Sequence, residues 1–332
     1  MSSNTVGKNA ISFLARILLS GALLWYLFSR IDFQKTIEVL RTAQPGFLVY
    51  AGIFFLAING ILLWRWGIFI KALEIASPAR DVVRYYFIGL FGNLFLPSSI
   101  GGDFIKIYGL CRSSPQKIRV ITSVLLDRLS GFAAIVLVAV ASFIFGYRLL
   151  GEGTLVIPIA AMAAVSLGVA FVLFNEKMYS FGCRIFARLP KIQKALMDIH
   201  YDIALMKGKR LEGAQAIGVS CLSQIVYAVC WYLIARALSQ EVSLVYFLIF
   251  VPLTCIAASF PSIGGLGVRE IGAVYLFGKV GMSPGVAASV SLINFLFMVA
   301  VGLMGGVVYV LTLSSGRLQY HSPDVPARPE QT

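Results

Sequence analysis

Six charged side chains lie within or beside the most apolar parts of the chain, and they are the first candidates for chemistry. A charge at membrane depth is costly, so such residues pair with one another or mark the path of a polar substrate. A guanidinium stays protonated and binds phosphate through two parallel hydrogen bonds, so Arg128 and Arg269 are the strongest candidates for anion binding. Structural ion pairs, Arg128 with Asp103 or Arg269 with Asp127, are the alternative. The six residues are Asp103, Lys106, Asp127, Arg128, Arg269 and Glu270.

Two similar interruptions, each rich in Pro, Ser and Gly, accompany these charges. The first is 97–102 and the second is 261–265, and each ends in a Gly-Gly pair. A half-helix that begins after each interruption carries free backbone N–H groups and a partial positive charge, and glycine lets an anion approach them. Close helix packing is the alternative role for these glycines. The candidate glycines are Gly101, Gly102, Gly264 and Gly265.

Two of the acidic residues also have simple structural roles open to them. Asp103 is placed to cap the half-helix that follows the first interruption. Glu270 is placed in the first turn of the second half-helix, where a negative charge balances the helix dipole. Either role competes with substrate binding at these two positions.

The composition places the whole chain in a membrane. Of 332 residues, 58% are apolar and 13% are charged, with a mean hydropathy of +0.84. Soluble domains average about 45–50% apolar and about 25% charged residues, so a soluble enzyme, a disulfide scaffold and a disordered protein are excluded. The formal charge of +13 fits basic loops facing anionic lipid rather than binding to nucleic acid.

Cysteine and histidine give no sign of a metal, cofactor or disulfide site. The five cysteines show no Cys-x-x-Cys spacing and mostly lie in apolar runs, as small buried hydrophobic residues do. Of the two histidines, His200 lies in a basic loop and His321 near the C-terminus. We therefore expect neither a metal nor a cofactor.

We predict an all-α polytopic membrane protein with about six full transmembrane helices. A spanning helix needs about 20 apolar residues. The first segment lacks a small-residue cleavage site, so we expect it to be retained rather than removed as a signal peptide. The six predicted spans are 10–29, 47–64, 120–146, 154–174, 213–235 and 286–313.

Two further apolar stretches, 85–112 and 244–280, are broken by the interruptions described above. The pieces on either side are too short to cross a bilayer, and irregular backbone at membrane depth must be buried in protein or face water. We predict two re-entrant broken-helix hairpins that enter from opposite faces, in an inverted-repeat-like arrangement typical of transporters. Two kinked full spans are the alternative.

The loop charges orient the chain with both termini in the cytoplasm. Loop 65–84 carries four basic residues and loop 175–212 carries eight, whereas the opposite loops 147–153 and 236–243 carry one each. This is the positive-inside pattern. Loop 30–46 carries three basic residues on the outer side and does not fit it.

The predicted membrane domain is 1–313, and it includes an amphipathic cytoplasmic segment. Apolar residues recur every three or four positions through 176–207 among basic residues. This segment either lies on the anionic leaflet or packs on the cytoplasmic end of the helix bundle. The Pro-rich tail 314–332 is predicted to be disordered.

The sequence resembles the transmembrane region of lysylphosphatidylglycerol synthase. The matching blocks occur in order from about residue 10 to 313. Lys106 stands where we expect arginine, so a point charge replaces a planar fork there. The blocks are Arg65-Trp66, Asn93 to Pro97, Gly101 to Lys106, Asp127 to Gly131, and Pro261 to Glu270.

This resemblance implies a lipid flippase of the cell inner membrane rather than an enzyme. It adds Asn93 to the candidate substrate-binding residues. The implied partners are membrane lipids: an anionic or aminoacylated phospholipid, or a polyprenyl- or hopanoid-type lipid. The synthase carries a soluble aminoacyl-transfer domain after its membrane part, and we expect none in this chain. A homo-oligomer is compatible with the sequence.

Two other functions are alternatives at this point. An integral membrane transferase acting on a lipid-phosphate or polyprenyl-linked donor would use Asp103 or Asp127 as its base. No paired acidic metal motif and no nucleophile–histidine arrangement supports it in the sequence. A small-solute secondary transporter is the second alternative.

Overall fold

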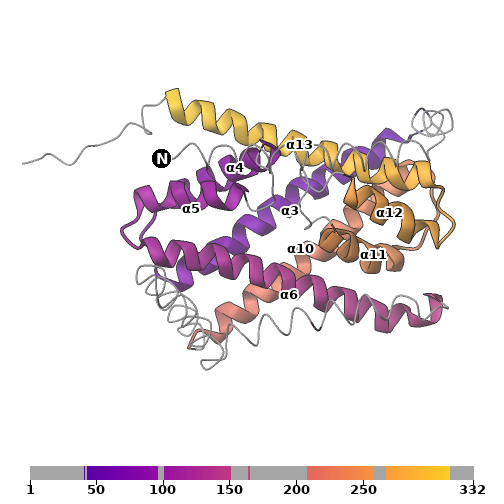
Figure 1. The fold of residues 1–332 in the computed structure, drawn as a ribbon, viewed down its shortest axis with the longest axis horizontal. Coiled ribbons are helices and arrows are strands. Elements are labelled where there is room, and N and C mark those ends of the chain that lie inside the picture. Colours follow the sequence, from indigo (N-terminus) through magenta and orange to yellow (C-terminus); the bar gives the residue numbers. More distant parts are fainter. Residues whose placement is uncertain are drawn as a thin grey trace, which may run out of the picture.

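The structure is a computed structural model that describes residues 41, 43–95, 101–150, 164, 208–257 and 267–314. These residues form eight helices and no strand, which confirms the predicted all-helical class (Figure 1). The helices are α3 (Pro45–Ala72), α4 (Ala79–Phe95), α5 (Gly101–Ser113), α6 (Lys117–Leu150), α10 (Arg210–Ala237), α11 (Leu244–Ala257), α12 (Val268–Gly278) and α13 (Pro284–Ser314).

Four of these helices are long and apolar enough to cross a membrane. They are α3, α6, α10 and α13, and each contains one predicted span. Predicted spans 10–29 and, apart from residue 164, 154–174 lie outside the described residues, as do segment 176–207 and the tail beyond Ser314. The count of six spans therefore stays a prediction.

The predicted loop beginning at residue 65 is wrong, because α3 continues through Ala72. Arg65 and Trp66 are buried inside the bundle, where the structure gives both side chains polar partners. A guanidinium that is neutralised by an internal partner does not need to end a helix at the membrane surface.

The helices α4 and α5 pack against each other, and the start of α4 and the end of α5 lie at the same end of the bundle. At this end, Arg119 near the start of α6 donates a hydrogen bond to the carbonyl oxygen of Leu73, at 3.1 Å. The Gln116 side chain accepts one from the Ala76 N–H, at 2.8 Å. The helix pair thus leaves from, and returns to, the junction between α3 and α6, whereas a single kinked helix would have ended at the opposite side.

The helices α11 and α12 form the second pair, at the other end of the bundle. There the Gln44 N–H, just before α3, donates to the carbonyl oxygen of Ala237 at the end of α10, at 2.9 Å. Figure 1 shows the α4–α5 pair and the α11–α12 pair at opposite ends of the long helices α6 and α13. The tips 96–100 and 258–266 lie outside the described residues. Re-entry of the two pairs into a bilayer stays a prediction.

The side chains are sorted as expected for a protein surrounded by lipid. Large apolar side chains such as Ile53, Trp64 and Leu311 are exposed on the outer faces of the helices. The interior combines aromatic packing, for example Phe247 against Phe277 with ring centroids 4.7 Å apart, with buried charged residues. Glycine allows the closest helix contacts, because a Cβ at Gly305 of α13 would overlap the backbone of α4.

Candidate functional site

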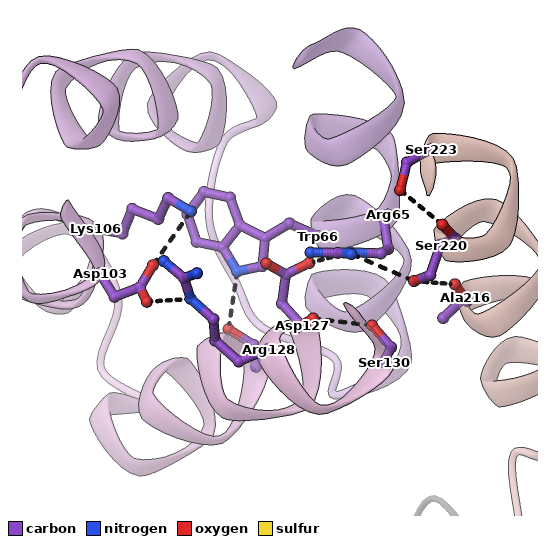
Figure 2. Close-up of polar contacts among 11 residues, drawn as sticks. Arg65, Trp66, Asp103, Lys106, Asp127, Arg128, Ser130, Ala216, Ser220 and Ser223 are labelled. Atoms are coloured by element: carbon purple, nitrogen blue, oxygen red, sulfur yellow. Dashed lines mark hydrogen bonds and ion pairs between the residues drawn. The ribbon is translucent and has the colours of Figure 1, made fainter. Parts of the chain in front are cut away.

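A buried ion pair joins α3 to α6. The Arg65 Nε atom lies 2.6 Å from the Asp127 Oδ1 atom, and both side chains are less than a tenth exposed. The same guanidinium donates to the Ser220 hydroxyl on α10, at 3.3 Å. Figure 2 shows Arg65 between Asp127 and Ser220, so three long helices meet at one charge.

A second ion pair joins α5 to α6 beside the first. The Arg128 Nε atom lies 2.5 Å from the Asp103 Oδ2 atom, and the Lys106 Nζ atom lies 3.4 Å from the Asp103 Oδ1 atom. The Asp103 side chain is 6% exposed, whereas that of Arg128 is 38% exposed. Arg128 is therefore the side chain through which this buried group reaches the surface of the bundle.

The Lys106 ammonium is enclosed by aromatic rings. Its Nζ atom lies 5.4 Å from the centroid of the Trp66 ring and 5.0 Å from that of Tyr86. The ring faces attract the cation, and the Trp66 indole is itself fixed by donating to Ser123, at 3.2 Å. These contacts stabilise the Lys106 ammonium in a buried position, where its side chain is only 8% exposed.

We call Arg65, Asp103, Lys106, Asp127 and Arg128 the first cluster. It contains three cations and two carboxylates, so the set carries one net positive charge. Arg65 lies seven residues before the end of α3, and Asp127 lies ten residues after the start of α6. At about 1.5 Å per residue, both lie about 10–15 Å inside the same end of the bundle.

The glycines of the first interruption are engaged by the protein where the structure describes them. Gly101 and Gly102 begin α5, and the N–H of Gly102 donates to the Asn93 side chain at 2.7 Å. A Cβ at Gly102 would overlap the Gly89 carbonyl oxygen on α4. Close packing of α4 on α5 therefore requires this glycine. Pro97, and Pro261 with Gly264 and Gly265, lie outside the described residues.

The second cluster consists of Arg269 and Glu270 on α12 with Ser291 on α13. The Arg269 Nη2 atom lies 3.0 Å from the Glu270 Oε1 atom, and the Ser291 hydroxyl donates to the same oxygen at 2.8 Å. The other Glu270 oxygen accepts from the Gly267 N–H at 2.6 Å, and Gly267 has a φ of 87°, which glycine tolerates. This cluster is electrically balanced, unlike the first one.

The structure shows which of the alternative ion pairs form. Arg128 pairs with Asp103, as one alternative predicted. The alternative pair of Arg269 with Asp127 is wrong, because Asp127 pairs with Arg65 and Arg269 pairs with Glu270. Glu270 lies in the first turn of α12, as predicted. The predicted capping role of Asp103 is wrong, because Asp103 is the third residue of α5 and its carboxylate pairs with Arg128 and Lys106 instead.

Sequence reasoning missed several partners in these clusters. Arg65 carried a usable signal, since the apolar pattern continues past it through Ile68, Phe69 and Ile70. Trp66 lies in a block of the family resemblance but was not singled out as a site residue. The remaining partners carried no signal of their own, because Ser and Tyr are common in membrane helices. They are Tyr86, Ser123, Ser220 and Ser291.

Comparison with known proteins agrees with this architecture. The chain is similar to "UPF0104 membrane protein PH1989" of Pyrococcus horikoshii, with 23% identity over 317 residues that cover 86% of this chain and 92% of the relative. Residues 13–306 match the family described as lysylphosphatidylglycerol synthase TM region. That match spans most of the sequence, all eight described helices except the end of α13, and both clusters. The chain therefore belongs to the membrane proteins of the lysylphosphatidylglycerol synthase TM region family.

Proposed function

We propose that this protein moves a polar membrane lipid from one leaflet to the other, with the lipid headgroup received at the first cluster. The observation that supports this most is the net positive charge of that cluster, buried among helices whose outer faces are apolar. A net positive charge in such surroundings is costly and favours the binding of an anionic group. A lipid phosphate supplies that group while its acyl chains stay in the bilayer.

Arg128 is the residue to which we assign the phosphate. Its side chain is the most exposed of the five in the first cluster, and its planar donors match phosphate geometry. Asp103 and Lys106 lie directly beside it on α5. The pair Arg65–Asp127 fixes α6 against α3, so it positions Arg128 for this task.

The two helix pairs supply the route for the headgroup in this proposal. The two pairs lie at opposite ends of the bundle (Figure 1). Each pair carries charged residues close to the start of its second helix. Relative movement of two such halves exposes a central site alternately to the two sides of a membrane. We assign Arg269 and Glu270, on α12, to the part of this route that the second pair forms.

The test is transbilayer movement of fluorescent phosphatidylglycerol in proteoliposomes, read by dithionite quenching. Wild-type protein should expose label from the inner leaflet, and Arg128→Gln should reduce this to the rate of protein-free vesicles. Arg112→Gln is the matched control, because Arg112 is an exposed arginine on α5 that stacks on Tyr108. Equal rates for Arg128→Gln and wild type would refute the proposal, provided that both proteins elute as folded particles.

The same vesicles separate lipid movement from transferase chemistry. Mass spectra of the lipids before and after the assay should be identical, since transport changes no covalent bond. A new lipid mass that depends on wild-type protein and disappears in Asp103→Asn or Asp127→Asn would favour a transferase instead.

A further inference from the structure

We infer that the Asp103 carboxylate is the internal occupant of the headgroup site, and that an arriving lipid phosphate displaces it from Arg128 onto Lys106. This inference rests on the proposed function and adds a competitor to it. Asp103 would then regulate how tightly the site holds its lipid.

The two oxygens of Asp103 are unequally satisfied. Oδ2 accepts the hydrogen bond from the Arg128 Nε atom. Oδ1 is buried, and among the described residues it accepts no hydrogen bond, although the Lys106 Nζ atom is 3.4 Å away. A buried carboxylate oxygen without a donor carries a desolvation cost. Movement of Oδ1 toward the Lys106 Nζ atom would give this oxygen a hydrogen bond. Lys106 is therefore a second cation with which the carboxylate can pair.

Lys106 is built to receive the carboxylate where it stands. Its ammonium is held between the rings of Trp66 and Tyr86 and lies on the same helix face as Asp103, three residues further along α5. The receiving cation is thus fixed in advance, and a small rotation of the Asp103 side chain is enough. The Arg65–Asp127 pair uses different atoms and is not disturbed by the exchange.

Arg128 is the partner that a lipid can reach. Its side chain is 38% exposed, against 6% for Asp103 and 8% for Lys106. A phosphate approaching along the bundle surface therefore meets Arg128 first and competes there with a carboxylate of the same charge sign. After the exchange, phosphate pairs with Arg128 and Asp103 with Lys106, so each anion has a cation.

The exchange has two consequences for transport. Competition by Asp103 lowers the apparent affinity for the headgroup, because only the fraction of sites without the internal occupant can bind it. Return of Asp103 to Arg128 also helps to expel the lipid. Since Asp103 is on α5 and Arg128 on α6, each exchange also removes and restores one tie between these helices.

The test is a double-mutant cycle on binding of dioctanoyl phosphatidylglycerol to the purified full chain, measured by calorimetry. Asp103→Asn keeps the shape and removes the competing charge, so the dissociation constant should fall about tenfold. Lys106→Gln removes the receiving cation, so the dissociation constant should rise about tenfold. In the Asp103→Asn background, however, Lys106→Gln should have almost no further effect, because no carboxylate needs a new partner.

The outcomes separate this inference from the proposed function. If wild type neither binds nor moves phosphatidylglycerol, the proposed function fails for this lipid. If wild type binds and moves it but Asp103→Asn binds equally or more weakly, the exchange is refuted. An equal loss from Lys106→Gln in both backgrounds also refutes it, since Lys106 would then contact the phosphate directly. Arg112→Gln, on the outer face of the same helix, should match wild type throughout.

Discussion

The Arg65–Asp127 pair offers the sharpest test of how the bundle is held together. Asp127→Asn keeps the side-chain shape but leaves the Arg65 guanidinium, less than a tenth exposed, without a counter-charge. Breaking one partner of a buried pair costs about 3–5 kcal/mol. The remaining neutral partner, the Ser220 hydroxyl at 3.3 Å, offsets about 1 kcal/mol at most.

This free-energy cost predicts a decrease in the melting temperature, Tm. In chains of 150–250 residues, 1 kcal/mol shifts Tm by about 2–4 °C, and by less in a longer chain such as this one, so Asp127→Asn should lower Tm by several degrees. Replacing both charges, in Arg65→Met with Asp127→Leu, should leave Tm equal to wild type or above it, because a packed apolar pair has no desolvation cost. Gly131 lies next to the guanidinium, so a slender side chain at position 65 is required.

Thermal unfolding of the detergent-solubilised protein, followed by intrinsic fluorescence, measures both variants. A double variant as unstable as Asp127→Asn would show that the loss in Asp127→Asn does not come from the uncompensated Arg65 charge, and the reasoning would fail. Transbilayer lipid movement by the double variant is a second measurement, of function rather than stability. It should persist, because we assign the phosphate to Arg128 and give Arg65 and Asp127 a positioning role only.

Three further predictions concern other parts of the bundle. Gly305→Ala should lower Tm because its Cβ would overlap the α4 backbone, whereas Gly60→Ala, with nothing within 4 Å, should leave Tm unchanged or raise it slightly. Glu270→Gln should destabilise the protein by about 3–5 kcal/mol in chemical unfolding, because it leaves a buried arginine uncompensated. Lys209→Met should speed hydrogen exchange at the end of α3, where the ammonium binds a carbonyl oxygen at 2.6 Å. Lys209 also holds the pKa of Glu74 below its usual range, so the small stabilisation from that pair is present above the usual pKa and disappears as the pH falls.

Length and apolarity were enough to predict the four described helices that are long and apolar enough to cross a membrane. Each of α3, α6, α10 and α13 contains a predicted span, because about 20 apolar residues have few other stable arrangements. Proline and paired glycine predicted an interruption within each of the stretches 85–112 and 244–280, because these residues end helices, and the structure describes two separate helices in each stretch. Both features depend on local sequence alone.

The pairing of the charges was not available from local sequence. Asp127 is 62 residues from Arg65, and its alternative partner Arg269 is even further along the chain. Only the packing of α3 on α6 selects between them. Arg65 was assigned to a loop because the first charge after an apolar run usually marks the membrane surface. Its buried partner removes that constraint, and no pattern within α3 reveals the partner.

Burial of Arg65 also bears on how the chain is assembled during synthesis. A lone arginine at the centre of a membrane segment costs about 2.5–3.5 kcal/mol on insertion scales, and Arg65, about 10 Å from the end of α3, incurs part of that cost. Helix α3 leaves the ribosome well before Asp127 does, so its guanidinium has no counter-charge when it first meets the translocon. Helix α3 must then remain next to protein or water until α6 has been inserted. Insertion of the bundle is therefore expected to be a concerted event rather than a helix-by-helix transfer into lipid.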